Sequence, residues 1–105
     1  MALDISIEFD EKNDAWNVSP RGEIDIYTSP ELKKELIERL KERRASLFMD
    51  FKDLDYIDST GLGALISILK IIRDDDKKIY IKNVKPNIRK LFDITDLDKI
   101  FIIEG

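Results

Sequence analysis

The sequence predicts an α/β domain with a mixed sheet, because segments with the pattern of strands alternate along the chain with segments that have the pattern of helices. The chain has 105 residues, which is the size of one domain. Hydrophobic residues make up 43% of it, and they are too frequent and too regularly spaced for a disordered chain. No apolar run reaches the ~18 residues of a membrane span, so we do not expect an integral membrane protein.

The N-terminal segment predicts a β-hairpin. Residues 4–9 alternate between polar and apolar side chains, and strand character returns at residues 15–18 after the polar turn 10–14. Pro20 and Gly22 are expected to interrupt the pairing of the second strand, with Gly22 at a bulge or bend.

A surface helix is expected next. Thr28 and Glu31 stand three residues apart, which is the spacing of a capping box. Pro30 disfavours helical geometry at Ser29, so either Thr28 or Ser29 can be the capping residue. The helix should end near residues 43–44. Its apolar face consists of Leu32, Leu36, Ile37 and Leu40.

The rest of the chain predicts three more strands and two more helices. Residues 47–51 are mostly apolar, which is typical of an interior strand covered on both faces. The later elements, in chain order, are a connection at 52–55, a helix from 59 to about 73, a strand at 79–81, a short helix from Pro86 and a last strand at 100–103.

Composition excludes several kinds of chemistry. Without cysteine or histidine, the chain cannot form a disulfide, a thiolate nucleophile, a Ser-His-Asp triad or a zinc site based on these residues. We therefore expect no cofactor, no metal and no enzymatic activity. The 18 basic and 22 acidic residues are interspersed, so nucleic acid is not an expected partner. Residues 1–5 have no basic stretch before an apolar one, so we predict no signal peptide and a cytoplasmic protein.

The most informative segment is residues 58–63, Asp-Ser-Thr-Gly-Leu-Gly. Asp58 and Ser59 are both good helix N-caps. Gly61 and Gly63 fall in the first turns of the helix, where each glycine costs ~1 kcal/mol relative to alanine, which suggests that something approaches the backbone closely. A phosphate on Ser59 would be stabilised by free amides. Alternatively, Ser59 is only a cap and the glycines only make a tight turn.

The helix that follows carries two apolar stripes. The second stripe begins beside Ser59, and it fits either a docking surface for a partner or packing against the sheet and a neighbouring helix. The first stripe is Leu62, Leu65, Ile66, Leu69 and Ile72, and the second is Gly61, Ala64, Ile68 and Ile71.

The sequence contains two groups of acidic residues that are candidates for a site. Glu23 and Asp25 precede the first helix, and they would lie near Ser59 if both loops share an edge of the sheet; alternatively they are two solvated acids. A second group has a spacing that matches no calcium loop, and its members are Asp50, Asp53, Asp55 and Asp58.

Residues 58–63 resemble the STAS domain, and more narrowly the stand-alone anti-sigma-factor antagonists of bacteria. A second motif of that family matches Gly22-Glu-Ile-Asp25 followed by Thr28, and residues 90–92, 97 and 100–101 resemble its late helix and last strand. The resemblance covers nearly the whole chain. It implies one STAS-like domain over residues 1–105, with a mixed sheet of four to five strands and helices mainly on one face.

The resemblance also implies a function. Antagonists of this family bind an anti-sigma factor, commonly a serine kinase, until that kinase phosphorylates them, and a serine phosphatase reverses the modification. By family position, the phosphorylated residue is Ser59, with Thr60 as the alternative. We expect a monomer. The expected partner-binding residues are Glu23, Asp25, Tyr27, Thr28, Asp58, Thr60, Gly61, Leu62, Gly63 and Ala64.

Three other functions remain open at this point. One is a receiver domain that is phosphorylated on Asp50 or Asp55 with magnesium. Another is a sensor of a small molecule or nucleotide that holds an anion in the 59–63 loop. The last is a STAS scaffold that is never phosphorylated.

Overall fold

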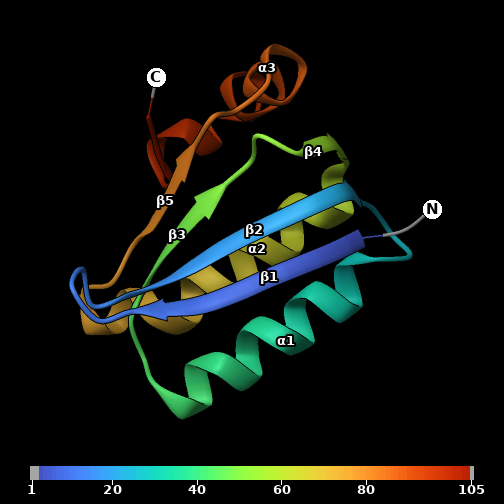
Figure 1. The fold of residues 1–105 in the computed structure, drawn as a ribbon. Helices are drawn as coiled ribbons and strands as arrows, with labels where there is room; N and C mark the ends of the chain where they lie inside the picture. Colours follow the sequence, from blue (N-terminus) through green and yellow to red (C-terminus); the bar gives the residue numbers. More distant parts are fainter. Residues whose placement is uncertain (1–2, 105) are drawn as a thin grey trace.

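The computed structural model describes residues 3–104 of the chain (Figure 1). These residues contain six strands, three α-helices and two 3₁₀ helices. Met1, Ala2 and Gly105, which the one-domain prediction includes, lie outside it. In chain order the elements are β1 (Leu3–Asp10), β2 (Ala15–Ile24), α1 (Ser29–Glu42), β3 (Ser46–Asp50), β4 (Leu54–Ile57), α2 (Ser59–Ile72), η1 (Arg73–Asp75), β5 (Ile79–Lys82), α3 (Pro86–Ile94), η2 (Leu97–Lys99) and β6 (Ile102–Ile103).

The sheet is mixed, as predicted. Its strand order is β1-β2-β3-β5-β6, with only β1 and β2 antiparallel, and β4 pairs with β2 beyond the end of β3. Strand β4 makes the sheet six-stranded where four to five strands were expected. It was missed because it has four residues and overlaps the charged segment 52–55. It forms because β2 is long enough to pair with β3 through Val18 and with β4 from Gly22 onwards.

Strand β2 runs through the residues that were expected to interrupt it. Pro20 is paired with Ile5 of β1, so the expected break there was wrong. Pro20 falls between the pairing of β2 with β3 and its pairing with β4, where its missing N–H removes no bond to either strand. Gly22 has φ 113°, and the register with β4 shifts between Gly22 and Glu23, which confirms the expected bulge.

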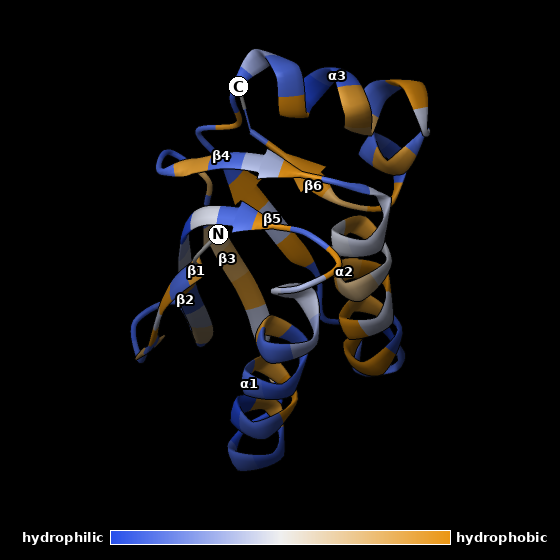
Figure 2. Ribbon diagram, turned by 90° about the vertical axis from the view of Figure 1, so that its right-hand side faces the viewer, coloured by the Kyte–Doolittle hydropathy of each residue, from blue (hydrophilic) through white to orange (hydrophobic). Residues whose placement is uncertain are grey.

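Helices α1 and α2 lie side by side against one face of the sheet (Figures 1 and 2). Leu47 and Met49 of β3 are buried on the helix side. Phe48 points to the opposite face, where it is only half-buried and packs edge-on against Tyr80 at a centroid distance of 5.0 Å. The expectation that this strand is covered on both faces was therefore wrong, since Phe48 stays half-exposed and none of the helices within residues 3–104 lies over it. The expectation of helices mainly on one face is confirmed.

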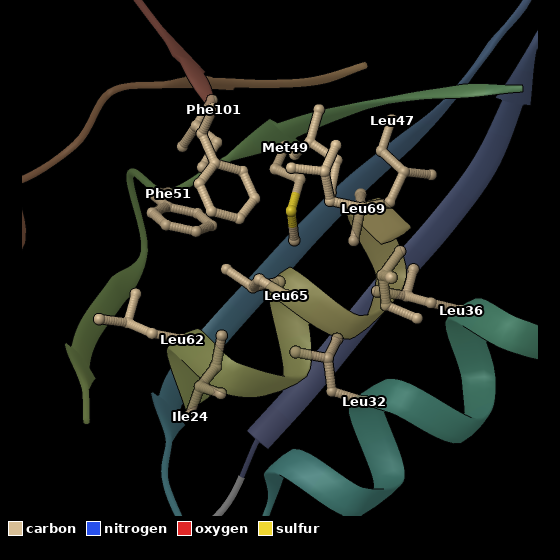
Figure 3. Close-up of a cluster of buried hydrophobic side chains, with 14 of the residues drawn as sticks. Ile24, Leu32, Leu36, Leu47, Met49, Phe51, Leu62, Leu65, Leu69 and Phe101 are labelled. Carbon is tan, nitrogen blue, oxygen red and sulfur yellow. The ribbon is translucent and has the colours of Figure 1, made fainter. Parts of the chain in front are cut away.

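The core lies between this sheet face and the two helices (Figure 3). Helix α1 buries Leu32, Leu36 and Leu40, as its apolar face predicted. Helix α2 buries most of both of its stripes, including Ala64 and Ile68 of the second stripe. The second stripe is thus part of the packing of the domain, and the docking-surface interpretation of that stripe was wrong.

Helix α3 closes the far end of the core. Phe92 packs against Phe51 after β3 and against Phe101 before β6, at centroid distances of 6.5 and 5.7 Å. All three rings are fully buried. Among residues 3–104, the helices are too short or too polar to cross a membrane.

Candidate functional site

Helix α2 starts at Ser59, and its start is fixed by Asp58. Asp58 has the extended backbone of an N-cap, and its carboxylate accepts a hydrogen bond from the Gly61 amide at 2.9 Å. The Asp58 amide donates to the carbonyl of Ile24 at 3.2 Å, which ties the helix start to the end of β2. Of the two candidate caps in the sequence, Asp58 is the one used, so Ser59 is free to serve another purpose.

Ser59 and Thr60 are the first two residues of α2, and both are exposed. Within residues 3–104, their amides donate to no other group, because Asp58 satisfies only the amide of Gly61. Unpaired amides at a helix start favour negative charge nearby. The hydroxyl of Ser59 is therefore accessible to another protein, and it lies where an added phosphate is electrostatically tolerated by the domain.

The two glycines of this segment differ in whether the fold requires them. A Cβ on Gly61 would lie 2.7 Å from Ile24 Cγ2, 2.7 Å from Ile57 Cγ1 and 2.9 Å from the Ile24 carbonyl oxygen. Gly61 is therefore required for the close approach of α2 to β2 and β4. A Cβ on Gly63 would meet nothing within 4 Å. The fold does not require Gly63, although a helix containing it is less stable.

The loop between β2 and α1 is held by a compact set of hydrogen bonds. The carboxylate of Asp25 accepts from the amides of Tyr27 and Thr28 at 2.9 and 3.0 Å. The hydroxyl of Thr28 accepts from the Asp25 amide at 2.9 Å and donates to the Glu23 carbonyl at 2.8 Å. Thr28 occupies the N-cap position of α1, but its hydroxyl is used in this loop, so the expected capping box with Glu31 does not form.

Asp25 is buried rather than solvated, with 8% of its surface exposed. Burial alone raises the pKa of its carboxyl, but the hydrogen bonds from Thr28 and Tyr27 outweigh burial, so the pKa lies below its ordinary value. The interpretation of this residue as a solvated acid was wrong. Asp25 is ionised at neutral pH and shapes the loop that leads into α1.

The two sequence motifs meet at one edge of the sheet. Strands β2 and β4 are parallel neighbours, so the segments that follow them, 25–28 and 58–63, emerge side by side. The hydrogen bond from the Asp58 amide to Ile24 joins them directly. The condition stated from the sequence, that both loops share an edge of the sheet, is therefore met.

Comparison with known proteins decides the family. The family model described as "STAS domain" matches residues 6–104. The chain belongs to the STAS domain family. It is 36% identical over 104 residues to the anti-sigma-B factor antagonist of Staphylococcus epidermidis, and the match covers 98% of this chain and 96% of that protein.

Solved structures share the fold of this STAS domain. A putative anti-sigma factor antagonist from Thermotoga maritima is 22% identical with a TM-score of 0.88, covering 96% of this chain and 86% of that one. The Bacillus cell fate determinant SpoIIAA in its phosphorylated form is 16% identical with a TM-score of 0.74, covering 97% of this chain and 92% of that one.

The STAS domain exposes large apolar side chains beside the two loops. Tyr27 is 84% exposed, Ile26 60% and Tyr56 46%. Tyr56 is paired with Glu23 across β2 and β4, which places it at the same edge of the sheet. Sequence reasoning singled out Tyr27 but missed Ile26 and Tyr56. The sequence does contain a signal for Ile26, because it is an apolar residue in a predicted loop, between Asp25 and Tyr27. Tyr56 could not be placed at this edge without knowing that β4 is a strand.

Several expected partner-binding residues cannot offer a side chain to a partner. Asp25, Thr28 and Leu62 are buried, and Gly61 is packed against Ile24. Their place in the site is to position the loops. The expected residues that remain accessible in whole or in part are Glu23, Tyr27, Asp58, Thr60 and Gly63, while Ala64 is 8% exposed at the edge of a groove between α1 and α2.

The acidic residues suggested as a receiver-type site do not converge on one point. Asp50 accepts hydrogen bonds from the Asn83 side chain and the Lys52 amide, at 2.9 and 3.0 Å. Asp55 forms an ion pair with Lys85 at 2.6 Å. Within residues 3–104, no three acidic residues are grouped so that they could hold a metal ion.

Proposed function

We propose that this STAS domain is an anti-sigma factor antagonist that binds its anti-sigma factor while Ser59 is unmodified and releases it when Ser59 is phosphorylated. The observation that carries the proposal is the exposed hydroxyl of Ser59 on the first residue of α2, next to amides without an internal partner. The name of the Staphylococcus relative supports the role, and the phosphorylated form of the structural neighbour SpoIIAA supports the modification.

Phosphorylation would act through charge at the contact surface. A phosphate adds about −1.5 to −2 charges at neutral pH. It would stand beside the half-buried carboxylate of Asp58, on a chain whose net charge is already −4. Burying this charge against a partner costs free energy, and a loss of ~1.4 kcal/mol already weakens binding tenfold. The fold need not change, since the amides at the helix start accommodate the phosphate.

The resemblance to the antagonist family implies the identity of the partners. The anti-sigma factor would itself be the serine kinase, using ATP, so that binding and modification occur at the same surface. A serine phosphatase would restore the binding form. Ile26, Tyr27 and Tyr56 provide an exposed apolar surface for the contact. Ile26 and Tyr27 lie in the segment 25–28, and Tyr56 lies on β4, just before the segment 58–63. The protein would act in the cytoplasm, where its partners regulate transcription.

The proposal is tested by titrating variants against the anti-sigma factor recovered with the wild-type protein from source cells. Ser59→Ala should bind like the wild type but resist phosphorylation, and Ser59→Asp should bind at least tenfold more weakly. Ser6→Asp is the matched control, because it adds the same charge at an exposed position on β1, away from α2. Equal affinities of the wild type and Ser59→Asp would contradict the proposal.

Unfolding measurements separate this effect from damage to the fold. An acidic residue in the first turn of α2 interacts favourably with the helix dipole, so Ser59→Asp should be at least as stable as the wild type. Weaker binding together with unchanged or raised stability is the expected combination. Weaker binding with a large loss of stability would mean that the variant reports on folding instead.

A further inference from the structure

Lys33 lies in a groove between α1 and α2, close to the proposed phosphorylation site. The groove measures about 320 Å³, and it is lined by Ser29, Pro30, Lys33, Thr60, Gly63, Ala64 and Ser67. Lys33 is half-buried there, and it is the one charged residue among these seven. Its side chain therefore borders the space between α1 and α2.

Lys33 has no acidic residue at the pairing positions of its own helix. The positions three and four residues away from it hold Ser29, Pro30, Leu36 and Ile37, none of which is acidic. By contrast, the neighbouring Lys34 has Glu31 and Glu38 at these spacings. The ion pairs among residues 3–104 use other bases, namely Arg43, Arg44, Lys85, Arg89 and Lys99.

We propose that the ammonium group of Lys33 pairs, within the same molecule, with the phosphate carried by Ser59. Thr60, the residue after Ser59, lines the same groove as Lys33. A lysine ammonium stands on a long flexible stem, so it can extend from the groove toward a phosphate on the neighbouring residue. The inference rests on the proposed function, because it concerns the modified state. Pairing would neutralise the cation that faces the groove, so phosphorylation would both add an anion and remove the positive charge available to a partner.

The experiment uses protein with phosphoserine installed at position 59 by genetic encoding, which requires neither a kinase nor a partner. The second pKa of the phosphate, ordinarily about 6, is measured by ³¹P NMR. A nearby cation lowers this pKa, while the Asp58 carboxylate opposes the effect equally in all variants. Lys33→Gln should raise the pKa by about 0.5, and Lys34→Gln, the matched control with the same change in charge, should leave it unchanged.

Two further measurements make the result specific. Lys33→Arg should retain the low pKa of the phosphate, because it keeps the positive charge. The difference in phosphate pKa between the Lys33→Gln protein and the phosphorylated protein that retains Lys33 should shrink in ~1 M salt. Equal pKa values in the Lys33→Gln and Lys34→Gln proteins would overturn the inference. This failure of the inference is distinct from a failure of the proposed function. If the proposed function failed, the native protein would bind its partner equally well with and without the phosphate.

Discussion

Replacing Gly63 by alanine should make this domain more stable and a weaker binder of its partner. Gly63 lies inside α2, where alanine is favoured over glycine by ~1 kcal/mol. The added methyl group would meet nothing within 4 Å, so no packing cost offsets this gain. For a domain of this size, ~1 kcal/mol corresponds to an increase in Tm of about 4–8 °C.

The position of Gly63 explains why binding should suffer. It lies one turn after Ser59 and lines the groove between α1 and α2, so a partner that contacts Ser59 approaches the backbone at Gly63. A methyl group at that contact would hold the two surfaces apart. We expect at least a tenfold loss of affinity, equivalent to ~1.4 kcal/mol, measured by calorimetry against the anti-sigma factor.

Gly61→Ala is the matched control. Its methyl group would lie 2.7 Å from two isoleucine side chains and 2.9 Å from a backbone carbonyl, and such overpacking costs ~1–3 kcal/mol. This cost offsets or exceeds the gain in helix propensity, so Tm should not rise and is expected to fall. If Gly63→Ala bound the anti-sigma factor as tightly as the wild type, the open space at Gly63 would have no role in docking.

Three further predictions concern the loops and the core. Asp25 has a lowered pKa, so its contribution to stability is present above the ordinary pKa of 3.8 and is lost as the pH falls below that value. Urea unfolding between about pH 2 and 6 should therefore show a smaller loss of stability on acidification for Asp25→Asn than for the wild type, and equal losses would contradict this account. Tyr27→Ala should weaken binding to the anti-sigma factor about tenfold or more, with little change in Tm, because this side chain is 84% exposed; unchanged affinity would remove it from the contact surface. Phe92→Ala should lower the free energy of unfolding by ~3–5 kcal/mol, as judged by chemical denaturation, since its ring is fully buried against Phe51 and Phe101; a loss below ~1 kcal/mol would contradict the packing described here.

The sequence predicted the elements whose signals are local. The alternation of residues 4–9, the apolar face of α1 and the cap and glycine pattern of 58–63 each lie within a few residues, and each formed as expected. The features that it missed depend on distant contacts. Strand β4 has only four residues. It forms because β2 extends past the end of its pairing with β3, which leaves that side of β2 open for another strand.

The candidate site shows the same division. The helix-start serine was identified from its neighbours in sequence. The different roles of Gly61 and Gly63 could not be identified from the sequence, because the clash that a side chain at position 61 would make is with Ile24 and Ile57 on two strands. Likewise, Asp25 was taken as either a surface acid or part of the site, since its hydrogen bonds with Thr28 and Tyr27 exist only once the loop has closed.

Calorimetry with chemically defined protein tests the central claim most directly. The domain carrying encoded phosphoserine at position 59 and the unmodified domain are titrated into the same preparation of anti-sigma factor, after equal folding of both forms has been verified by circular dichroism. We predict that the unmodified domain binds and that the phosphorylated domain binds at least tenfold more weakly. Indistinguishable affinities for the two forms would show that a phosphate at the start of α2 does not control docking.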